Sequence, residues 1–301
     1  MPHVVAQIQF QEKINPGRER LRNTSVADFL NEYFFKLPLA VSGKAEPYRY
    51  LGDWDKVESL LSSPTVDLLV ASQRLGVSQG KNPVTRSEVH DLLHQGYTLG
   101  FRHVQNDDDA LLQVVRAFEQ ALTAPADIHL YCTPAGERGF GWHYDAEEVF
   151  VVQTYGSKEW SLRKNTVNPW PLIETLPGDM KYHREIMPLI RCHLQAGDWL
   201  YIPAGYWHST AATEDSISLS IGLNCRTGID VYDVLRAELL QDMRWRQRLP
   251  VISNTSELTD KEKTEHLRPI FNELAADLAR RLKDDALLQR FVFLTGRILS
   301  K

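Results

Sequence analysis

Three residues in the second half of the chain have the types and the spacing of a metal-binding set. His143 and Asp145 are separated by one residue and precede an apolar run with the pattern of a β-strand. Because side chains alternate along an extended chain, the imidazole and the carboxylate point to the same side. His208 follows a Pro-Ala-Gly turn and supplies a second imidazole. Two histidines and one carboxylate leave three octahedral positions free, which suits an Fe(II) site that binds a bidentate cosubstrate and then O₂.

Other metal sites fit the sequence less well. A zinc site prefers sets rich in His and Cys, and a cupin site for Mn or Ni typically has more histidines and a glutamate. His90 and His94 have the spacing of an HExxH zinc protease, but the glutamate of that motif is missing. We therefore interpret this pair as part of an exposed helix surface.

Lys158 is placed to bind an anion. It follows the turn at residues 155–157 and begins a predicted strand in which it shares a face with Trp160 and Leu162. An ammonium group that points toward an apolar interior needs an anionic partner. The pattern thus predicts a negatively charged ligand near Lys158.

Two further predicted strands carry hydrogen-bonding side chains on one face. In residues 128–133 and 216–221, every second residue is polar and the residues between are apolar. Such faces suit the lining of a polar pocket, although the serines also fit a solvent-facing surface. The polar residues are His129, Tyr131, Thr133, Ser216, Ser218 and Ser220.

The hydrophobic period divides the chain into three regions. Residues 1–126 predict helices separated by loops that pack on a barrel, including a helix after the acidic run 107–109. Residues 127–225 have the pattern of many short strands, which is typical of a barrel or sandwich. Residues 226–301 return to a helical pattern, and Pro269 should delay or kink the last of these helices. The predicted strands span residues 128–133, 149–155, 158–163, 191–195, 199–202 and 216–224.

Composition narrows the class of protein. The chain has 301 residues, is 43% hydrophobic and 24% charged, and contains three scattered cysteines, so neither a disulfide framework nor a CxxC metal site is expected. We see no signal-peptide pattern and no run of about 18 apolar residues, so we expect a cytoplasmic protein without a membrane segment. A net charge of −5 argues against direct nucleic-acid binding.

At these motifs the chain resembles the JmjC/cupin-like 2-oxoglutarate oxygenases. It resembles especially the ribosomal oxygenases and the asparaginyl hydroxylase that acts on hypoxia-inducible factor. The matching stretches are residues 128–164, which contain GWHYDAEEVF, and residues 196–211, which contain GDWLYIPAGYWHST. FLNEYFFKLPL (residues 29–39) resembles the entry helix of these enzymes. It implies a double-stranded β-helix, the JmjC or cupin jelly roll, with flanking helices.

The resemblance also implies roles for individual residues. It makes His143, Asp145 and His208 the Fe(II) ligands and the catalytic centre. Lys158 pairs with the distal carboxylate of 2-oxoglutarate and Tyr131 contacts the same cosubstrate, with His129 and Ser218 as further cosubstrate contacts. Two positions depart from the relatives: Phe140 replaces a cosubstrate-binding threonine of the asparaginyl hydroxylase, and His129 replaces an asparagine of the ribosomal oxygenases.

We expect a dioxygenase that uses Fe(II), 2-oxoglutarate and O₂ to hydroxylate a protein or peptide side chain. Hydroxylation of a small molecule and demethylation of N-methyl-lysine are alternatives that the same iron site permits. A metal-binding cupin that serves as sensor or scaffold is the non-enzymatic alternative, but it has no use for Lys158 and Tyr131. The apolar stripes of residues 232–243 and 267–282 also predict a homodimer formed by the C-terminal helices.

Overall fold

The computed structural model describes residues 10–11, 23–24, 26–74, 77–81, 85–178, 180, 182, 187, 189–251 and 258–297. Contacts divide the chain into two compact units, Met1–Cys225 and Arg226–Lys301.

The first unit contains all the strands of the described residues, together with short helices. In chain order these elements are β1 (Phe10–Gln11), β2 (Asn23–Thr24), α2 (Val26–Glu32), β3 (Leu39–Val41), η1 (Glu46–Leu51), α3 (Trp54–Leu61), β4 (Asp67–Ser72), β5 (Val77–Lys81), α4 (Arg86–His94), β6 (Thr98–Arg102), η2 (Val104–Asn106), α5 (Asp109–Leu122), β7 (Ala126–Thr133), β8 (Glu148–Tyr155), β9 (Ser157–Arg163), η3 (Ile173–Thr175), β10 (Ile190–Gln195), β11 (Trp199–Ile202), β12 (Trp207–Ala212) and β13 (Ser216–Leu223).

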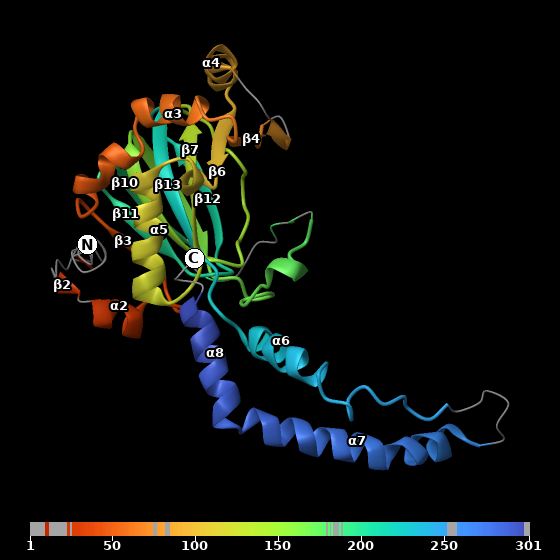
Figure 1. Cartoon of the computed structure of the whole chain (residues 1–301). Coiled ribbons are helices and arrows are strands. Elements are labelled where there is room, and N and C mark those ends of the chain that lie inside the picture. Colours follow the sequence, from red (N-terminus) through yellow and green to blue (C-terminus); the bar gives the residue numbers. More distant parts are fainter. Residues whose placement is uncertain are drawn as a thin grey trace. The chain divides into compact units, whose positions relative to one another are not determined.

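Two antiparallel sheets form the body of this unit (Figure 1). The large sheet has the order β3-β11-β8-β13-β7-β6-β4-β5, and the small sheet has the order β10-β9-β12. The two pack face to face, because buried side chains of β8 and β11 form one apolar cluster with those of β9 and β10. The predicted double-stranded β-helix is confirmed, and the six predicted strands agree with the structure to within two residues at each end.

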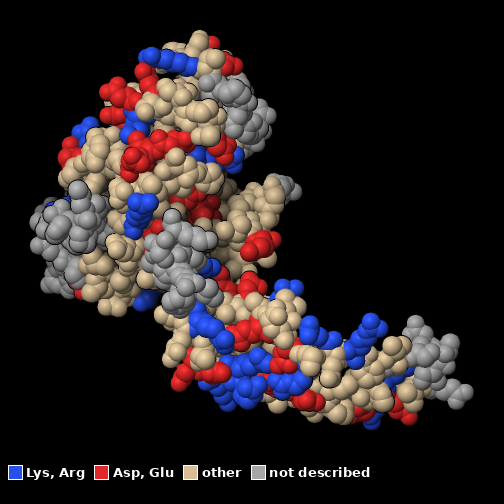
Figure 2. Space-filling model, viewed as in Figure 1, with Lys and Arg blue, Asp and Glu red and all other residues tan. Residues whose placement is uncertain are grey.

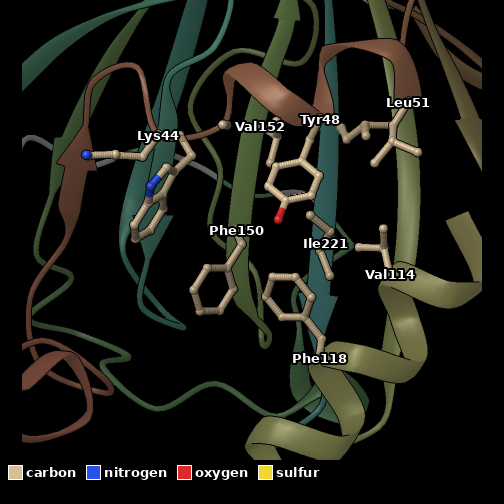
Figure 3. Close-up of a pocket in the computed structure, with 11 residues that line it drawn as sticks. Lys44, Tyr48, Leu51, Val114, Phe118, Phe150, Val152 and Ile221 are labelled. Atoms are coloured by element: carbon tan, nitrogen blue, oxygen red, sulfur yellow. The ribbon is translucent and has the colours of Figure 1, made fainter. Parts of the chain in front are cut away.

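Alternation along β8 explains how one strand serves both sides of the large sheet. Val149 and Val151 belong to the cluster between the sheets, whereas Phe150 packs in the main core on the other face. Helices η1 and α5 cover that outer face and enclose an apolar cavity of about 40 Å³ (Figure 3). In Figure 3, Phe118 from α5 points toward Phe150, so the helix and the strand share one core.

The expectation that residues 1–126 form helices and loops on the barrel needs correction. Strands β3, β4, β5 and β6 come from this region and belong to the large sheet itself. Residues Leu68–Ala71 and Thr98–Phe101 are mostly buried on both faces, so they read as continuous apolar runs without the alternation that marks a half-exposed strand. The expected helices at α2, α4 and α5 are confirmed, and Asp108 caps α5 by accepting a hydrogen bond from the Leu111 amide.

The second unit is helical and consists of α6 (Gly228–Leu239), α7 (Asp260–Leu282) and α8 (Asp285–Arg297). Glu238 of α6 pairs with Arg281 of α7 and with Arg290 of α8, and Asp277 of α7 accepts hydrogen bonds from Trp245 and Arg281. Basic and acidic side chains lie together on its surface (Figure 2). Pro269 does not delay α7, because the Thr259–Glu262 capping box starts the helix at Asp260. No helix of the described residues is both long and apolar enough to cross a membrane.

Candidate metal centre and cosubstrate cavity

Backbone hydrogen bonds bring the three predicted metal ligands together. His143 and Asp145 lie on the segment between β7 and β8, and His208 is the second residue of β12. The amide of His143 donates to the carbonyl of His208 at 3.0 Å, and the reverse bond measures 2.8 Å. The carbonyl of Asp145 accepts from the Gly205 amide at 2.8 Å. Residues far apart in the sequence are thereby fixed side by side, and we call His143, Asp145 and His208 the cavity cluster.

Both imidazole rings of the cavity cluster are oriented by carbonyl groups. Nδ1 of His143 lies 3.0 Å from the Gly141 carbonyl oxygen, and Nδ1 of His208 lies 3.0 Å from that of Tyr206. Each Nδ1 therefore carries the proton, which leaves the Nε2 lone pair for a metal ion. Nε2 of His208 is 3.4 Å from Oδ2 of Asp145, and one ligand atom from each of the three residues lies within 4.8 Å of the others.

The protonation state of the cavity cluster also fits a cation. Burial, followed by the nearby His143, lowers the pKa of His208 below its ordinary value, so its imidazole is neutral at physiological pH. A neutral imidazole and a carboxylate are the forms that bind a metal ion. The residues present thus fit a divalent transition metal held by two nitrogens and one oxygen.

The turn before His208 is held by a buried glutamate. Glu148 accepts hydrogen bonds from the Ala204 amide at 3.1 Å and from the Tyr201 hydroxyl. Gly205 adopts φ +79°, and a Cβ at this position would lie 2.8 Å from the Pro169 carbonyl oxygen. Glycine is therefore required at this turn both by its conformation and by the close approach of backbone.

A cavity of about 280 Å³ lies between the two sheets and opens onto the cavity cluster. Lys158 lines its wall, is only 3% exposed, and donates a hydrogen bond from Nζ to Oγ of Ser218 at 2.9 Å. Burial lowers the pKa of Lys158 to about 8. A buried ammonium bonded to a neutral hydroxyl is under-compensated, so the cavity favours an anion.

The structure brings most of the predicted cosubstrate residues to this cavity. Tyr131, Ser218 and Phe140 line it, and the Phe140 ring lies 5.8 Å from the rings of both Tyr131 and His143. His129 is not among the lining residues, and its Nδ1 instead lies 3.2 Å from the Tyr131 hydroxyl. His129 therefore reaches the cavity through the hydroxyl of Tyr131.

Sequence reasoning missed two polar residues of the cavity wall. Thr98 comes from β6 and Thr210 from β12, neither of which was among the predicted strands. The short β-prone run that follows the Gly96 turn was the available signal for β6. For Thr210, alternation from His208 along an extended chain would have placed both side chains on one face.

Residues 101–231 match the JmjC domain family. This region of the chain is similar to a JmjC domain. The match includes the cavity cluster, Lys158 and Tyr131, and the family resemblance inferred from the motifs is confirmed.

The chain is similar to curated relatives of much greater length. It is 27% identical to ribosomal oxygenase 1 of Gallus gallus, in an alignment that covers 74% of this chain and 40% of the relative. It is 25% identical to the bifunctional lysine-specific demethylase and histidyl-hydroxylase NO66 of Aedes aegypti, covering 71% of this chain and 36% of the relative. The chain spans less than half the length of these relatives.

Solved structures share the fold. The ribosomal oxygenase YcfD of Escherichia coli in complex with cobalt and 2-oxoglutarate superposes with a TM-score of 0.58 at 20% identity, covering 88% of this chain and 68% of that one. YcfD in complex with cobalt and succinic acid gives a TM-score of 0.56 at 21% identity, with 82% and 66% covered. At this identity, the likeness concerns the fold.

Proposed function

We propose that this JmjC domain is an Fe(II)- and 2-oxoglutarate-dependent dioxygenase that hydroxylates a protein side chain. The observation that carries the proposal is one cavity that contains both a two-histidine, one-carboxylate set and a buried lysine without an anionic partner among the described residues. The first feature suits Fe(II) with open positions, and the second suits a dicarboxylate. Each feature alone also occurs in other kinds of site, but their combination in one cavity matches the needs of this chemistry.

His143, Asp145 and His208 would hold the iron, and Lys158 would bind the distal carboxylate of 2-oxoglutarate together with Ser218. Tyr131 lines the same cavity and offers a hydroxyl to the cosubstrate, with His129 acting through that hydroxyl. When bound, the iron and cosubstrate supply oxidising chemistry in which 2-oxoglutarate, O₂ and a substrate C–H bond give succinate, CO₂ and a C–OH bond. The protein contributes fixed ligand geometry and the cavity that holds both the metal ligands and Lys158.

A protein side chain is the substrate class that the relatives support. Their names describe ribosomal oxygenases and a histidyl hydroxylase, so we place a histidine of a protein first among the candidate targets. The test is to load the protein with Fe(II) and 2-oxoglutarate without oxygen, add O₂ and cell-extract peptides, and identify peptides that gain one oxygen atom by mass spectrometry. The Asp145→Ala protein is the control. Succinate formation without any oxidised peptide would contradict a protein substrate.

Demethylation of N-methyl-lysine is the second candidate function, because one relative's name combines both activities. Oxidation of an N-methyl group releases formaldehyde, whereas hydroxylation of a ring or methylene carbon does not. Formaldehyde production from methylated peptides, with no stable gain of oxygen, would favour the demethylase. A small-molecule substrate is favoured if only the low-molecular-weight fraction of the extract stimulates succinate formation.

We also propose a homodimer formed by the C-terminal helices. Large apolar side chains of this unit are exposed, and such patches usually mark interfaces. Examples are Tyr232, Met243, Phe271 and Leu282. Light scattering at micromolar concentration should give twice the chain mass for wild type and one chain mass for the Phe271→Asp/Leu282→Asp protein. Val167→Asp, at an exposed position of the first unit, is the matched control. Wild type that remains monomeric would contradict the proposal.

We place the protein in the cytoplasm. The three cysteines, Cys132, Cys192 and Cys225, are free thiols, as expected in a reducing compartment. Fluorescence microscopy of the tagged protein tests this assignment, and export from the cell would contradict it. The net charge of −5 supports a protein partner over direct nucleic-acid contact.

A further inference from the structure

A second set of two histidines and one carboxylate lies apart from the cavity cluster. Asp127 and His129 are on β7, and His103 lies between β6 and η2. Strands β6 and β7 are neighbours in the large sheet, so pairing brings residues far apart in sequence together (Figure 1). One ligand atom from each residue lies within 4.8 Å of the other two. We call these residues the edge cluster.

The carboxylate of the edge cluster is shared by both imidazoles. Oδ2 of Asp127 lies 2.5 Å from Nδ1 of His103 and 3.4 Å from Nε2 of His129. Its other oxygen, Oδ1, accepts a hydrogen bond from Nε2 of Gln105 at 2.5 Å. Gln105 is itself anchored, because its Oε1 accepts from the Ile128 amide at 3.0 Å. The carboxylate is thus oriented by an outer partner, as ligand carboxylates in metal sites are.

His129 is oriented in the same manner. Its Nδ1 faces the Tyr131 hydroxyl at 3.2 Å. Its Nε2 is buried and faces the Asp127 carboxylate at 3.4 Å, but forms no hydrogen bond of good geometry with any residue that the structure describes. A buried ring nitrogen without a hydrogen bond is costly, and a metal ion would satisfy it.

The residue types of the edge cluster suit a cation. Asp127 lies between the two histidines and offers its carboxylate oxygen to the space they share. A carboxylate between two imidazoles is a ligand set suited to Zn²⁺ and similar borderline ions.

We propose that His103, Asp127 and His129 form a second metal site, which binds a tetrahedral divalent transition-metal ion such as Zn²⁺ beside the cosubstrate cavity. Ligand atoms around tetrahedral zinc are about 3.3 Å apart, given zinc–ligand distances of about 2.0–2.1 Å. The spacing of Asp127 and His129 already matches, and the side chain of His103, which is 49% exposed, must withdraw by roughly 0.8 Å. The fourth position is left for water. Because His129 contacts Tyr131, the ion fixes the orientation of that hydroxyl in the cavity.

The test is a titration of the chelator-treated full chain with Zn²⁺ by calorimetry, with metal content measured after dialysis. Wild type should bind two ions per chain, and the Asp145→Ala protein should retain the ion of the edge cluster. His103→Ala, a change at a half-exposed side chain, should lose that ion. Gln105→Ala should weaken it by about tenfold to a hundredfold, the usual effect of removing an outer partner. His193→Ala, at an exposed histidine of β10, is the matched control.

Co²⁺ gives an independent readout, because four-coordinate Co²⁺ absorbs visible light more strongly than six-coordinate Co²⁺. The Asp145→Ala protein should develop the strong four-coordinate spectrum, and adding His103→Ala should abolish it. The proposal is overturned if Asp145→Ala binds no ion, or if His103→Ala and Asp127→Asn bind Zn²⁺ with the stoichiometry and affinity of wild type. Neither outcome affects the proposed function of the cavity cluster, which the succinate assay tests separately.

Discussion

The cavity cluster and the edge cluster have the same three residue types but different surroundings. In the cavity cluster, carbonyl oxygens orient both rings, His208 is 5% exposed, and the cluster faces a cavity that contains Lys158. In the edge cluster the His103 ring is half exposed, and none of its three residues lines the cavity that contains Lys158. The comparison teaches that two histidines and a carboxylate predict a metal ion, whereas the neighbouring cavity and its charge predict the chemistry.

The largest expected effect is on succinate formation, which should depend on the cavity cluster and not on the edge cluster. His208→Ala, His143→Ala and Asp145→Ala should each abolish Fe(II)-dependent succinate formation, because a three-ligand site has no spare ligand. His103→Ala should keep succinate formation within about threefold of wild type, since loss of an outer partner through Tyr131 is a small perturbation. Succinate measured by mass spectrometry checks both. Equal loss in His103→Ala and His208→Ala would make the clusters one functional unit and break the comparison.

The next effect concerns Lys158, which lines the same cavity as the cavity cluster. Lys158→Met keeps the aliphatic stem and removes the charge, so folding and Fe(II) binding should persist. The dissociation constant of 2-oxoglutarate should rise by about tenfold to a few hundredfold, which corresponds to roughly 1.5–3 kcal/mol for a hydrogen bond to a charged group. Lys164→Met, at an exposed lysine just beyond the same strand, is the control.

Thermal unfolding provides the readout for Lys158. Metal-loaded wild type should gain stability on addition of 2-oxoglutarate, Lys164→Met should gain as much, and Lys158→Met should gain much less. An equal gain in all three proteins would mean that the anion binds elsewhere.

A smaller effect should appear in the pH dependence of 2-oxoglutarate binding. Burial lowers the pKa of Lys158 in the free protein to about 8. Only the protonated ammonium attracts the carboxylate, so the dissociation constant should be flat below that pH and rise by up to about tenfold per pH unit above it. Lys158→Met should lack this rise. A wild-type profile that stays flat from pH about 7 to about 9 would remove Lys158 as the titrating group.

The smallest effects concern the backbone at each cluster. Gly205→Ala places a Cβ against the Pro169 carbonyl at positive φ and should cost about 1–3 kcal/mol, lowering Tm by several degrees. His103 also has positive φ, +55°, but its side chain is half exposed and glycine relieves this backbone conformation, so His103→Gly should change stability by no more than about 1 kcal/mol. Calorimetric melting of both proteins checks this order. A larger loss of stability in His103→Gly than in Gly205→Ala would show that the turn at the edge cluster, and not the turn at the cavity cluster, is the more constrained.

Alternation of polar and apolar residues made some strands predictable, and its absence hid others. β9 and β13 were predictable because one face is polar and the other apolar, and this alternation also placed Lys158 and Ser218. β4 and β6 were missed since burial on both faces erases the alternation. The edge cluster escaped because His103 and Asp127 meet only through the pairing of β6 with β7, which no local pattern reveals.

The most direct test of the central claim is an anaerobic titration of Fe(II)-loaded protein with 2-oxoglutarate, followed by visible absorption. Bidentate binding of 2-oxoglutarate to Fe(II) gives a metal-to-ligand charge-transfer band. The account predicts that wild type develops this band at one 2-oxoglutarate per chain, that Lys158→Met requires a higher concentration, and that His208→Ala shows none. A band of full intensity in His208→Ala, or no band in wild type, would contradict it.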